Sequence, residues 1–325
     1  MSAETLPRID VSTLLREAET VCAVHRGALG DFLQTWPVLC SLAEHLPASK
    51  LVWAGRTDRQ LWATPLGLQP CPPKLRQAVE SIPSVRSWPE TLRTTAVIWF
   101  GLQKSPAERP FPQLLFLPGI LPGHDSPPRE IYAQGIERAG VPIVEDWLVR
   151  FRKLFRLEPE PASDQTTVLL FPGAGHPLRC WPLDSFLHLA DWLDRQGLKP
   201  CFVLGPAEME RHVRVQDFEH CCLWDLQDLQ TRLCRARLAV GNDTGPLHLA
   251  GYLGLPVVSL FGPSSAAQWA PVGARVVSLN LSCSPCSRTG QVSCQDPACM
   301  TGIGMAAVQQ AVSEVLNQTG QSESR

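Results

Sequence analysis

The 325-residue chain has no apolar run of the roughly 18 to 20 residues that a membrane span requires. The stretch from Met1 to Thr20 also lacks the apolar segment of a signal peptide, so we expect a protein that stays in the cytoplasm. The formal net charge is only −2, which excludes a strongly basic surface for coating nucleic acid. No nucleic-acid partner is therefore expected.

Three phosphate-binding motifs are absent as well. There is no Asp-x-Asp triplet of the kind that holds Mg²⁺ or Mn²⁺ on a sugar-nucleotide diphosphate. The Walker phosphate loop and the Gly-x-Gly-x-x-Gly fingerprint are missing too, so kinases and dehydrogenases lack the motifs that bind their nucleotides. These absences disfavour metal-held and dinucleotide-dependent chemistry.

The chain does contain 12 cysteines, but they are spread along its length and no export signal accompanies them. That distribution predicts reduced thiols rather than a disulfide framework. Several lie in apolar segments and are expected to be small core residues. These are Cys22, Cys40, Cys201 and Cys234.

Short apolar runs alternate with helical or proline-rich segments, which is typical of parallel sheets covered by helices. The predicted strands are residues 20–24, 51–54, 96–100, 114–117, 168–171, 201–204, 238–240 and 257–261. The predicted helices are residues 32–45, 127–140, 145–157, 183–196, 226–235 and 246–253. Residues 105–128 are dense in proline and are expected to be mostly loop.

The order of these elements predicts an α/β protein with two domains. Residues 158–165 contain alternating Glu and Pro and break all periodicity, so they form the predicted linker. It separates a first domain, residues 1–157, from a second, residues 166–325, and each is long enough to bury its own core. For the last helix, two positions stay open: on its own domain, or packed back on the first.

Residues 241–250 form the strongest candidate for a ligand site. Their sequence, Gly-Asn-Asp-Thr-Gly-Pro-Leu-His-Leu-Ala, follows a strand and opens a helix. Gly245 permits close backbone approach, Pro246 suits the first helical turn, and the amino end of the helix favours a diphosphate. The alternative is a plain capped helix, with Asp243 or Thr244 as an ordinary N-cap and His248 as a core residue.

Residues 243–250 resemble the donor-binding motif of glycosyltransferase family 9, the bacterial lipopolysaccharide heptosyltransferases. Further segments match in family order, from Gly27 to about Met300, and so cover most of the chain. They are Leu-Gly-Asp-Phe-Leu-Gln-Thr-Trp-Pro (29–37), Pro-Gly-Ala-Gly (172–175), Arg-Cys-Trp-Pro (179–182), Leu-Gly-Pro-Ala-Glu-Met-Glu (204–210), Phe-Gly-Pro-Ser (261–264) and a cysteine-containing segment (283–300).

The resemblance implies a GT-B fold, in which two Rossmann-like domains face each other across a cleft. The first domain would bind the acceptor and the second the nucleotide sugar. The implied reaction is an inverting, metal-independent transfer of heptose from ADP-heptose to a lipopolysaccharide core or related glycan, with no cofactor. Two alternatives stay open: a transferase using another nucleotide sugar or a protein or exopolysaccharide acceptor, and a non-catalytic sugar-nucleotide-binding subunit.

The same resemblance assigns the site residues. Asp31 would be the general base that takes a proton from the acceptor hydroxyl, with Gly27 and Gly30 in the acceptor loop. Without the resemblance, Asp31 would be interpreted as a helix N-cap. The implied donor-binding residues are Arg179, Glu208, Asp243, Thr244, Gly245 and His248. Many family members carry Lys where this chain has Arg179, which keeps the charge but changes the hydrogen-bond geometry.

Two further features have alternative interpretations. Cys283, Cys286, Cys294 and Cys299 have the spacing C-x2-C-x7-C-x4-C, which fits structural thiols or a zinc or iron knuckle. The helix at residues 145–157 alternates aromatic and basic residues. It either covers the sheet of the first domain or makes a peripheral contact with the inner membrane, where a glycolipid acceptor would lie.

Overall fold

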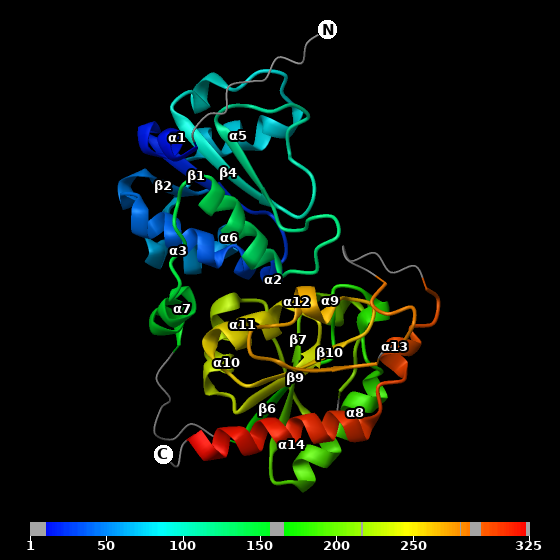
Figure 1. Ribbon diagram of the computed structural model, residues 1–325. Helices are drawn as coiled ribbons and strands as arrows, with labels where there is room; N and C mark the ends of the chain where they lie inside the picture. Colours follow the sequence, from blue (N-terminus) through cyan, green and yellow to red (C-terminus); the bar gives the residue numbers. More distant parts are fainter. Residues whose placement is uncertain (1–10, 157–165, 216, 280, 287–293, 323–325) are drawn as a thin grey trace. The chain divides into compact units, whose positions relative to one another are not determined.

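The computed structural model describes residues 11–156, 166–215, 217–279, 281–286 and 294–322 (Figure 1). The chain forms two compact units, residues 1–148 and 149–325. The predicted linker at 158–165 lies outside the described residues. Because the division falls at Leu148, almost all of α7 (Trp147–Phe155) belongs to the second unit, whereas the sequence placed this segment in the first domain.

The first unit contains a five-stranded sheet of order β3-β2-β1-β4-β5, and every pairing is parallel. Its strands are β1 (Thr20–Val24), β2 (Leu51–Trp53), β3 (Gln69–Pro70), β4 (Thr95–Gly101) and β5 (Leu114–Pro118). In the centre, Cys22 of β1 pairs with Val52 of β2 on one side and Val97 of β4 on the other. These continuous apolar strands are typical of a parallel sheet that is buried on both faces.

The helices of the first unit cover this sheet. They are α1 (Val11–Glu17), α2 (Leu29–Gln34), α3 (Trp36–His45), α4 (Gln60–Ala63), α5 (Pro73–Ser81) and α6 (Pro128–Arg138). The predicted single helix at 32–45 was wrong, because the structure divides it at Thr35. The Thr35 hydroxyl donates to Phe32 O at 2.7 Å, and Pro37 has no N–H to continue a helical ladder.

The second unit contains a six-stranded, all-parallel sheet of order β11-β10-β9-β6-β7-β8. Its strands are β6 (Thr167–Phe171), β7 (Lys199–Leu204), β8 (Glu219–Cys222), β9 (Leu238–Asn242), β10 (Val257–Phe261) and β11 (Arg275–Ser278). The sequence did not predict β8 and β11. Both are edge strands with exposed residues, so neither produces an apolar run.

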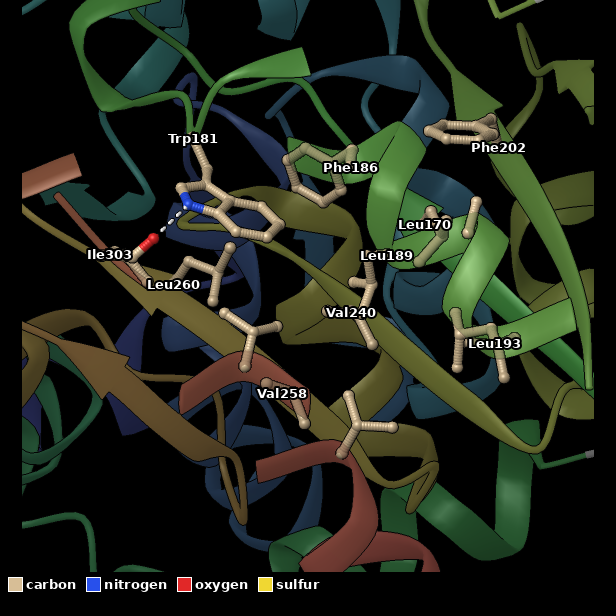
Figure 2. Packing of buried hydrophobic residues seen from close by; sticks show 14 of the residues in the cluster. Leu170, Trp181, Phe186, Leu189, Leu193, Phe202, Val240, Val258, Leu260 and Ile303 are labelled. Atoms are coloured by element: carbon tan, nitrogen blue, oxygen red, sulfur yellow. Dashed lines mark hydrogen bonds between the residues drawn. The ribbon is translucent and has the colours of Figure 1, made fainter. Parts of the chain in front are cut away.

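Two helices of the second unit pack on its sheet and form the main core with it; Figure 2 shows part of this core. They are α8 (Leu183–Arg195), with the predicted buried face of Phe186, Leu189, Ala190 and Leu193, and α14 (Met305–Ser322). Besides α7, the remaining helices are α9 (Pro206–Glu210), α10 (Leu226–Arg235), α11 (Gly245–Leu253), α12 (Ala266–Trp269) and α13 (Ala298–Thr301). The main contacts of α14 are with β10, β11 and α8 of its own unit.

Helix α7 packs on the second unit, not on the sheet of the first domain as one interpretation expected. The Phe151 ring meets Tyr252 of α11 edge-on at 5.2 Å, and the Gln230 side chain donates to Phe155 O at 2.9 Å. Val149 and Leu154 stay 64% and 45% exposed. Within the described residues, no helix has both the length and the apolar character needed to cross a bilayer.

The strand order of each sheet reverses at one position. In the first unit it reverses between β1 and β4, and in the second between β6 and β9. Open α/β sheets bind ligands at the carboxyl ends of strands beside such a switch point. The α/β class with two Rossmann-like domains is therefore confirmed, and the loops after β1, β6 and β9 are where a site is expected.

Candidate active site

Asn242 joins the two loops at the switch point of the second unit. It is the last residue of β9, and its side chain is fully buried. Its Nδ2 donates to Pro172 O at 2.7 Å, and its Oδ1 accepts from the Trp181 N–H at 2.9 Å. One amide side chain thus fixes both ends of the loop after β6 against the end of β9. The sequence did not predict this role, although an Asn directly before Asp243 was the available signal.

Trp181 holds the same loop in the core (Figure 2). Its indole Nε1 donates to Ile303 O at 3.0 Å, and its ring packs edge-on against Phe186 with centroids 5.1 Å apart. The paired N–H removes the penalty of burying an unsatisfied indole donor. The short 3₁₀ turn Pro177–Arg179 lies just before this fixed residue, so Arg179 is held close to the end of β9.

Arg179 and Asp243 form the charged pair of this site. Arg179 Nη1 lies 3.5 Å from Asp243 Oδ2, and the two side chains are only 16% and 12% exposed. His248 Nε2 lies 4.0 Å from Asp243 Oδ1, which is an ion pair only when the imidazole is protonated. His248 is buried, as the core interpretation expected, but it also borders the site. The structure therefore brings these three predicted residues together.

The amino end of α11 stands beside this pair. Thr244 occupies the N-cap position, as the plain-cap interpretation expected. Its hydroxyl makes no capping hydrogen bond, so capping does not explain why a threonine stands here. Gly245 is the first helical residue, and residues 243–246 are all partly exposed. The positive end of the helix dipole and the Arg179 guanidinium together favour an anion here.

Glu208 lies in the first turn of α9, which follows β7. Its Oε2 accepts a hydrogen bond from the Gly205 N–H at 2.8 Å. A Cβ at Gly173 would overlap the Glu208 carboxylate, so this carboxylate lies directly against the loop after β6. Position 173 is glycine because no side chain fits between the two loops. The half-buried Glu208 can accept hydrogen bonds from hydroxyl or amino groups of a ligand.

Asp31 lies in the corresponding loop of the first unit, after β1. It is the third residue of α2, and its Oδ2 accepts from the Ala28 N–H at 3.3 Å. Ala28 is the N-cap, so the N-cap interpretation of Asp31 was wrong, although the carboxylate does support the first turn. Asp31 is partly exposed, as a group that accepts a substrate proton has to be.

The two predicted loop glycines lie beside Asp31. A Cβ at Gly27 would lie 2.9 Å from His25 Nε2 and 3.0 Å from Asp31 Oδ2, which is too close for a side chain. Gly30 is the second residue of α2 and is buried. Gly27 is therefore needed for the close approach of the histidine ring and the carboxylate.

Two buried side chains of this region were missed from the sequence. Tyr132 donates from its hydroxyl to Gly101 O at 3.2 Å, and burial, followed by the charge of Asp31, raises the pKa of Tyr132. His25 directly follows β1, and its Nδ1 makes no hydrogen bond to the described residues. Burial, and then the charge of Arg59, lowers the pKa of His25 to about 3. The sequence signal that could have identified His25 was a polar residue at the end of a strand. No sequence signal identified Tyr132.

The neutral His25 predicts a loss of stability in acid. The unfolded chain protonates His25 near pH 6.5, whereas the folded chain does so only near pH 3, so stability falls as pH is lowered between these values. The slope from this group reaches about 1.4 kcal/mol per pH unit. Urea unfolding from pH 7 to pH 4 is expected to show a shallower slope in His25→Gln. The exposed His45→Gln is the control, and equal slopes in all three proteins would contradict the prediction.

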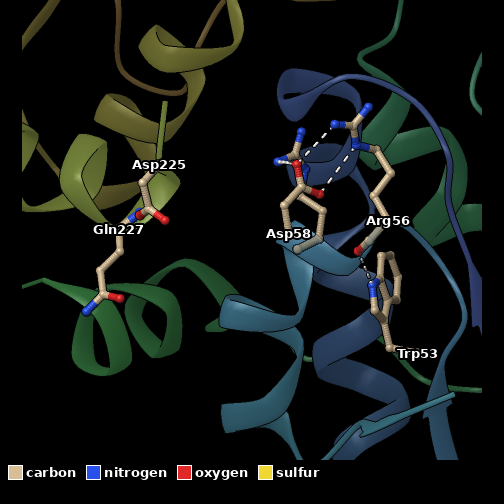
Figure 3. A network of polar contacts seen from close by, with 6 residues as sticks. Trp53, Arg56, Asp58, Asp225 and Gln227 are labelled. Atoms are coloured by element: carbon tan, nitrogen blue, oxygen red, sulfur yellow. Dashed lines mark hydrogen bonds and ion pairs between the residues drawn. The ribbon is translucent and has the colours of Figure 1, made fainter. Parts of the chain in front are cut away.

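Arg59 belongs to a polar network that follows β2 (Figure 3). Trp53 Nε1 donates to Arg56 O at 2.9 Å, and Asp58 accepts from Arg56 at 3.1 Å and from Arg59 at 3.0 Å. Arg59 is 5% exposed, so its charge acts through protein and lowers the pKa of the neighbouring His25. Figure 3 also shows Asp225, which caps α10 in the second unit by accepting from the Gln227 N–H at 2.6 Å.

The four clustered cysteines are all free thiols. The pKa of the Cys299 thiol is raised, first by burial and then by the neighbouring thiols of Cys286, Cys294 and Cys283. Over the residues that the structure describes, no three His, Cys, Asp or Glu side chains are placed to hold a metal ion. This arrangement gives no support to the zinc or iron knuckle. Cys299 instead packs in the core formed by α13 and β10.

Sequence comparison matches most of the second unit to a known family and finds curated relatives of part of the chain. Residues 147–295 match the model of glycosyltransferase family 9 (heptosyltransferase). Lipooligosaccharide heptosyltransferase 2 of Campylobacter jejuni is 30% identical over 80 residues, which is 24% of this chain and 24% of that protein. The chain spans about a quarter to a third of the length of the curated relatives that it matches.

Two solved structures share the fold over nearly the whole chain. A family 9 glycosyltransferase from Veillonella parvula is 19% identical with a TM-score of 0.65, and the match covers 92% of this chain and 98% of that one. The ADP-heptose LPS heptosyltransferase II of E. coli is 16% identical with a TM-score of 0.61, and the match covers 93% and 99%. The matched residues 147–295 contain Arg179, Asp243 and His248, and also Glu208. This part of the chain is therefore similar to glycosyltransferase family 9 (heptosyltransferase), in agreement with the motifs of the sequence.

Proposed function

We propose that the protein transfers a heptosyl group from ADP-heptose to a lipopolysaccharide core or a related glycan acceptor. The observation that carries the proposal is the Arg179 and Asp243 pair, 3.5 Å apart, beside the amino end of α11 at the β6/β9 switch point. This is an anion site in the position where α/β sheets bind nucleotides. The match of residues 147–295 to family 9 and the fold shared with an ADP-heptose LPS heptosyltransferase support heptose as the sugar and ADP as the nucleotide.

The proposed donor contacts follow from the chemistry of each group. Arg179 and the backbone at Thr244–Gly245 would bind the diphosphate, with Asp243 and His248 orienting the guanidinium and the start of α11. Glu208 would accept hydrogen bonds from hydroxyl or amino groups of the nucleoside. As the bond between the anomeric carbon and the diphosphate oxygen breaks, negative charge grows on the leaving ADP. Fixed positive groups stabilise that charge more in the transition state than in the bound donor.

Asp31 is the proposed general base. An acceptor hydroxyl that attacks the anomeric carbon has to lose its proton, and a carboxylate within hydrogen-bond reach can take it. Attack on the side opposite the diphosphate inverts the anomeric configuration. The proton then resides on Asp31 until solvent removes it, so the carboxylate is regenerated for each turnover.

We propose that this transfer needs no metal ion, since Arg179 and the helix end already supply positive charge and the sequence has no Asp-x-Asp triplet. Activity that survives treatment with EDTA supports this part, and activity that returns only with added Mg²⁺ contradicts it. The proposed place of action is the cytoplasmic side of the inner membrane, with a glycolipid acceptor and a peripheral contact of the protein.

Ligand-induced thermal shifts test the donor. ADP and ADP-heptose are expected to raise the melting temperature, whereas a UDP-sugar is not. Arg179→Gln is expected to weaken ADP binding by about tenfold to a hundredfold, because it removes charge-assisted hydrogen bonds worth about 1.5–3 kcal/mol. Arg195→Gln, at the exposed far end of α8, is the matched control. Protection by a UDP-sugar alone would contradict the proposed donor.

A further inference from the structure

The second unit contains a cavity of about 500 Å³ at the end of the sheet opposite the donor loops. It is lined at the first residues of β10 and β11, Val257 and Arg275, whereas the donor loops follow the last residues of β6 and β9. Helix α11 connects the two ends, since it begins beside Asp243 and ends at Gly254 in the cavity wall. The volume suits a small metabolite.

Arg152 of α7 and Arg275 of β11 line this cavity, and Arg156 lies next to Gly254 in its wall. A Cβ at Gly254 would lie 3.1 Å from Arg152 Nε and 3.4 Å from Arg156 Nη1, so two guanidinium groups converge on this glycine. Arg275 contributes a third from the start of β11. The only carboxylate among the lining residues is Glu314 of α14, paired with Arg275 at 2.9 Å. The border therefore carries an excess of positive charge.

Arg152 and Arg275 make different contacts. Arg152 donates to Tyr252 O at 3.3 Å and Gly251 O at 3.4 Å and so caps the carboxyl end of α11. Burial, and then the charge of Arg156, lowers the pKa of Arg152, which is the electrostatic cost of placing the two groups side by side. Arg275 and Glu314 are 54% and 37% exposed, so their pairing is weak and can yield to a stronger anion.

We propose that this cavity binds a small soluble molecule carrying a phosphoryl group, at a site separate from the donor loops. Guanidinium groups bind phosphoryl oxygens with short, charge-assisted hydrogen bonds. A dianion bound beside Arg152 and Arg275 relieves the repulsion between the Arg152 and Arg156 guanidinium groups. The cavity is larger than phosphate alone, so a phosphorylated sugar of ordinary size also fits. A bound molecule would join α7, α11 and α14.

Calorimetric titration with inorganic phosphate and with glucose 6-phosphate tests the site, and tighter binding of the ester identifies a phosphorylated metabolite over free phosphate. To exclude the donor loops, both titrations are done with Arg179→Gln and with wild-type protein saturated with ADP. Binding is expected to persist in both. Loss of binding in either would place the phosphoryl group in the donor loops and overturn the proposal.

Variants at the cavity are expected to change the binding affinity in opposite directions. Arg156→Gln and Arg275→Gln are each expected to weaken binding by about tenfold, whereas Glu314→Gln removes the carboxylate and is expected to tighten it by about threefold. Arg156 is exposed, so its variant is expected to fold even if Arg275→Gln does not. Unchanged binding in Arg156→Gln, weaker binding in Glu314→Gln, or no binding to the wild type would each overturn the proposal.

Discussion

Replacement of Asp31 by Asn is expected to lower kcat by a factor of about 10²–10⁴, the usual contribution of a positioned general base. The carbonyl oxygen of Asn can still accept the hydrogen bond that Asp31 Oδ2 receives from the Ala28 N–H, so helix α2 keeps its first turn. The amide cannot take the proton of the acceptor hydroxyl. The loss is therefore expected in the chemical step and not in folding.

Steady-state transfer assays combined with ADP titration separate these effects. Binding of ADP is expected to be unchanged in Asp31→Asn, because the donor residues are in the other unit. Asp31→Glu is the comparison that keeps a carboxylate, and it is expected to retain more activity than the amide. Full turnover by Asp31→Asn would remove Asp31 as the base, and a parallel loss of thermal stability would assign it a structural role.

Replacement of Asn242 by Leu is expected to destabilise the second unit by about 2–5 kcal/mol, since it leaves two buried backbone groups without partners. These are the Trp181 N–H and the Pro172 carbonyl. Leu has a similar volume, so most of the cost comes from the lost hydrogen bonds and not from a cavity. The released loop also carries Arg179, so ADP affinity is expected to fall with stability.

Chemical denaturation of Asn242→Leu and of a control, Ser259→Ala, measures this cost. Ser259 is also fully buried on the neighbouring β10, but its hydroxyl makes no hydrogen bond to the described residues. Removing it is expected to be neutral or stabilising. A cost below about 1 kcal/mol for Asn242→Leu, similar to that of the control, would show that the amide does not hold the loop.

The sequence predicted those parts of the fold where one physical signal dominates. Strands β1 and β10 and helix α10 have the predicted bounds, since apolar runs and an Asp N-cap set them locally. The cluster of Arg179 and Asp243 was also predicted, because strand ends and the family motif agree. The fold was confirmed, and residues 147–295 match the family that the motifs resemble. The roles of Asp31 and of the donor residues stay predictions.

The errors arose where neighbours distant in sequence decide the outcome. Edge strands β8 and β11 form because the central sheet offers them partners, and neither contains an apolar run of its own. Helix α7 has an amphipathic pattern that would suit either domain, and only its contacts with α10 and α11 assign it to the second unit. Likewise, nothing local distinguishes Asn242 from an ordinary strand-ending residue before its partners Trp181 and Pro172 are in place.

The strand order of the second unit has a consequence for how the site forms during folding. Strand β6 pairs with β9, and β7 and β8 lie between them in sequence, so the two halves of the donor loop meet only after a long chain closure. Such distant pairings are made late, because the entropy of closing the loop is lost before the contacts form. A chain that ends before β9 therefore cannot pair Arg179 with Asp243. The proposed donor site can thus form only after β6 and β9 have paired.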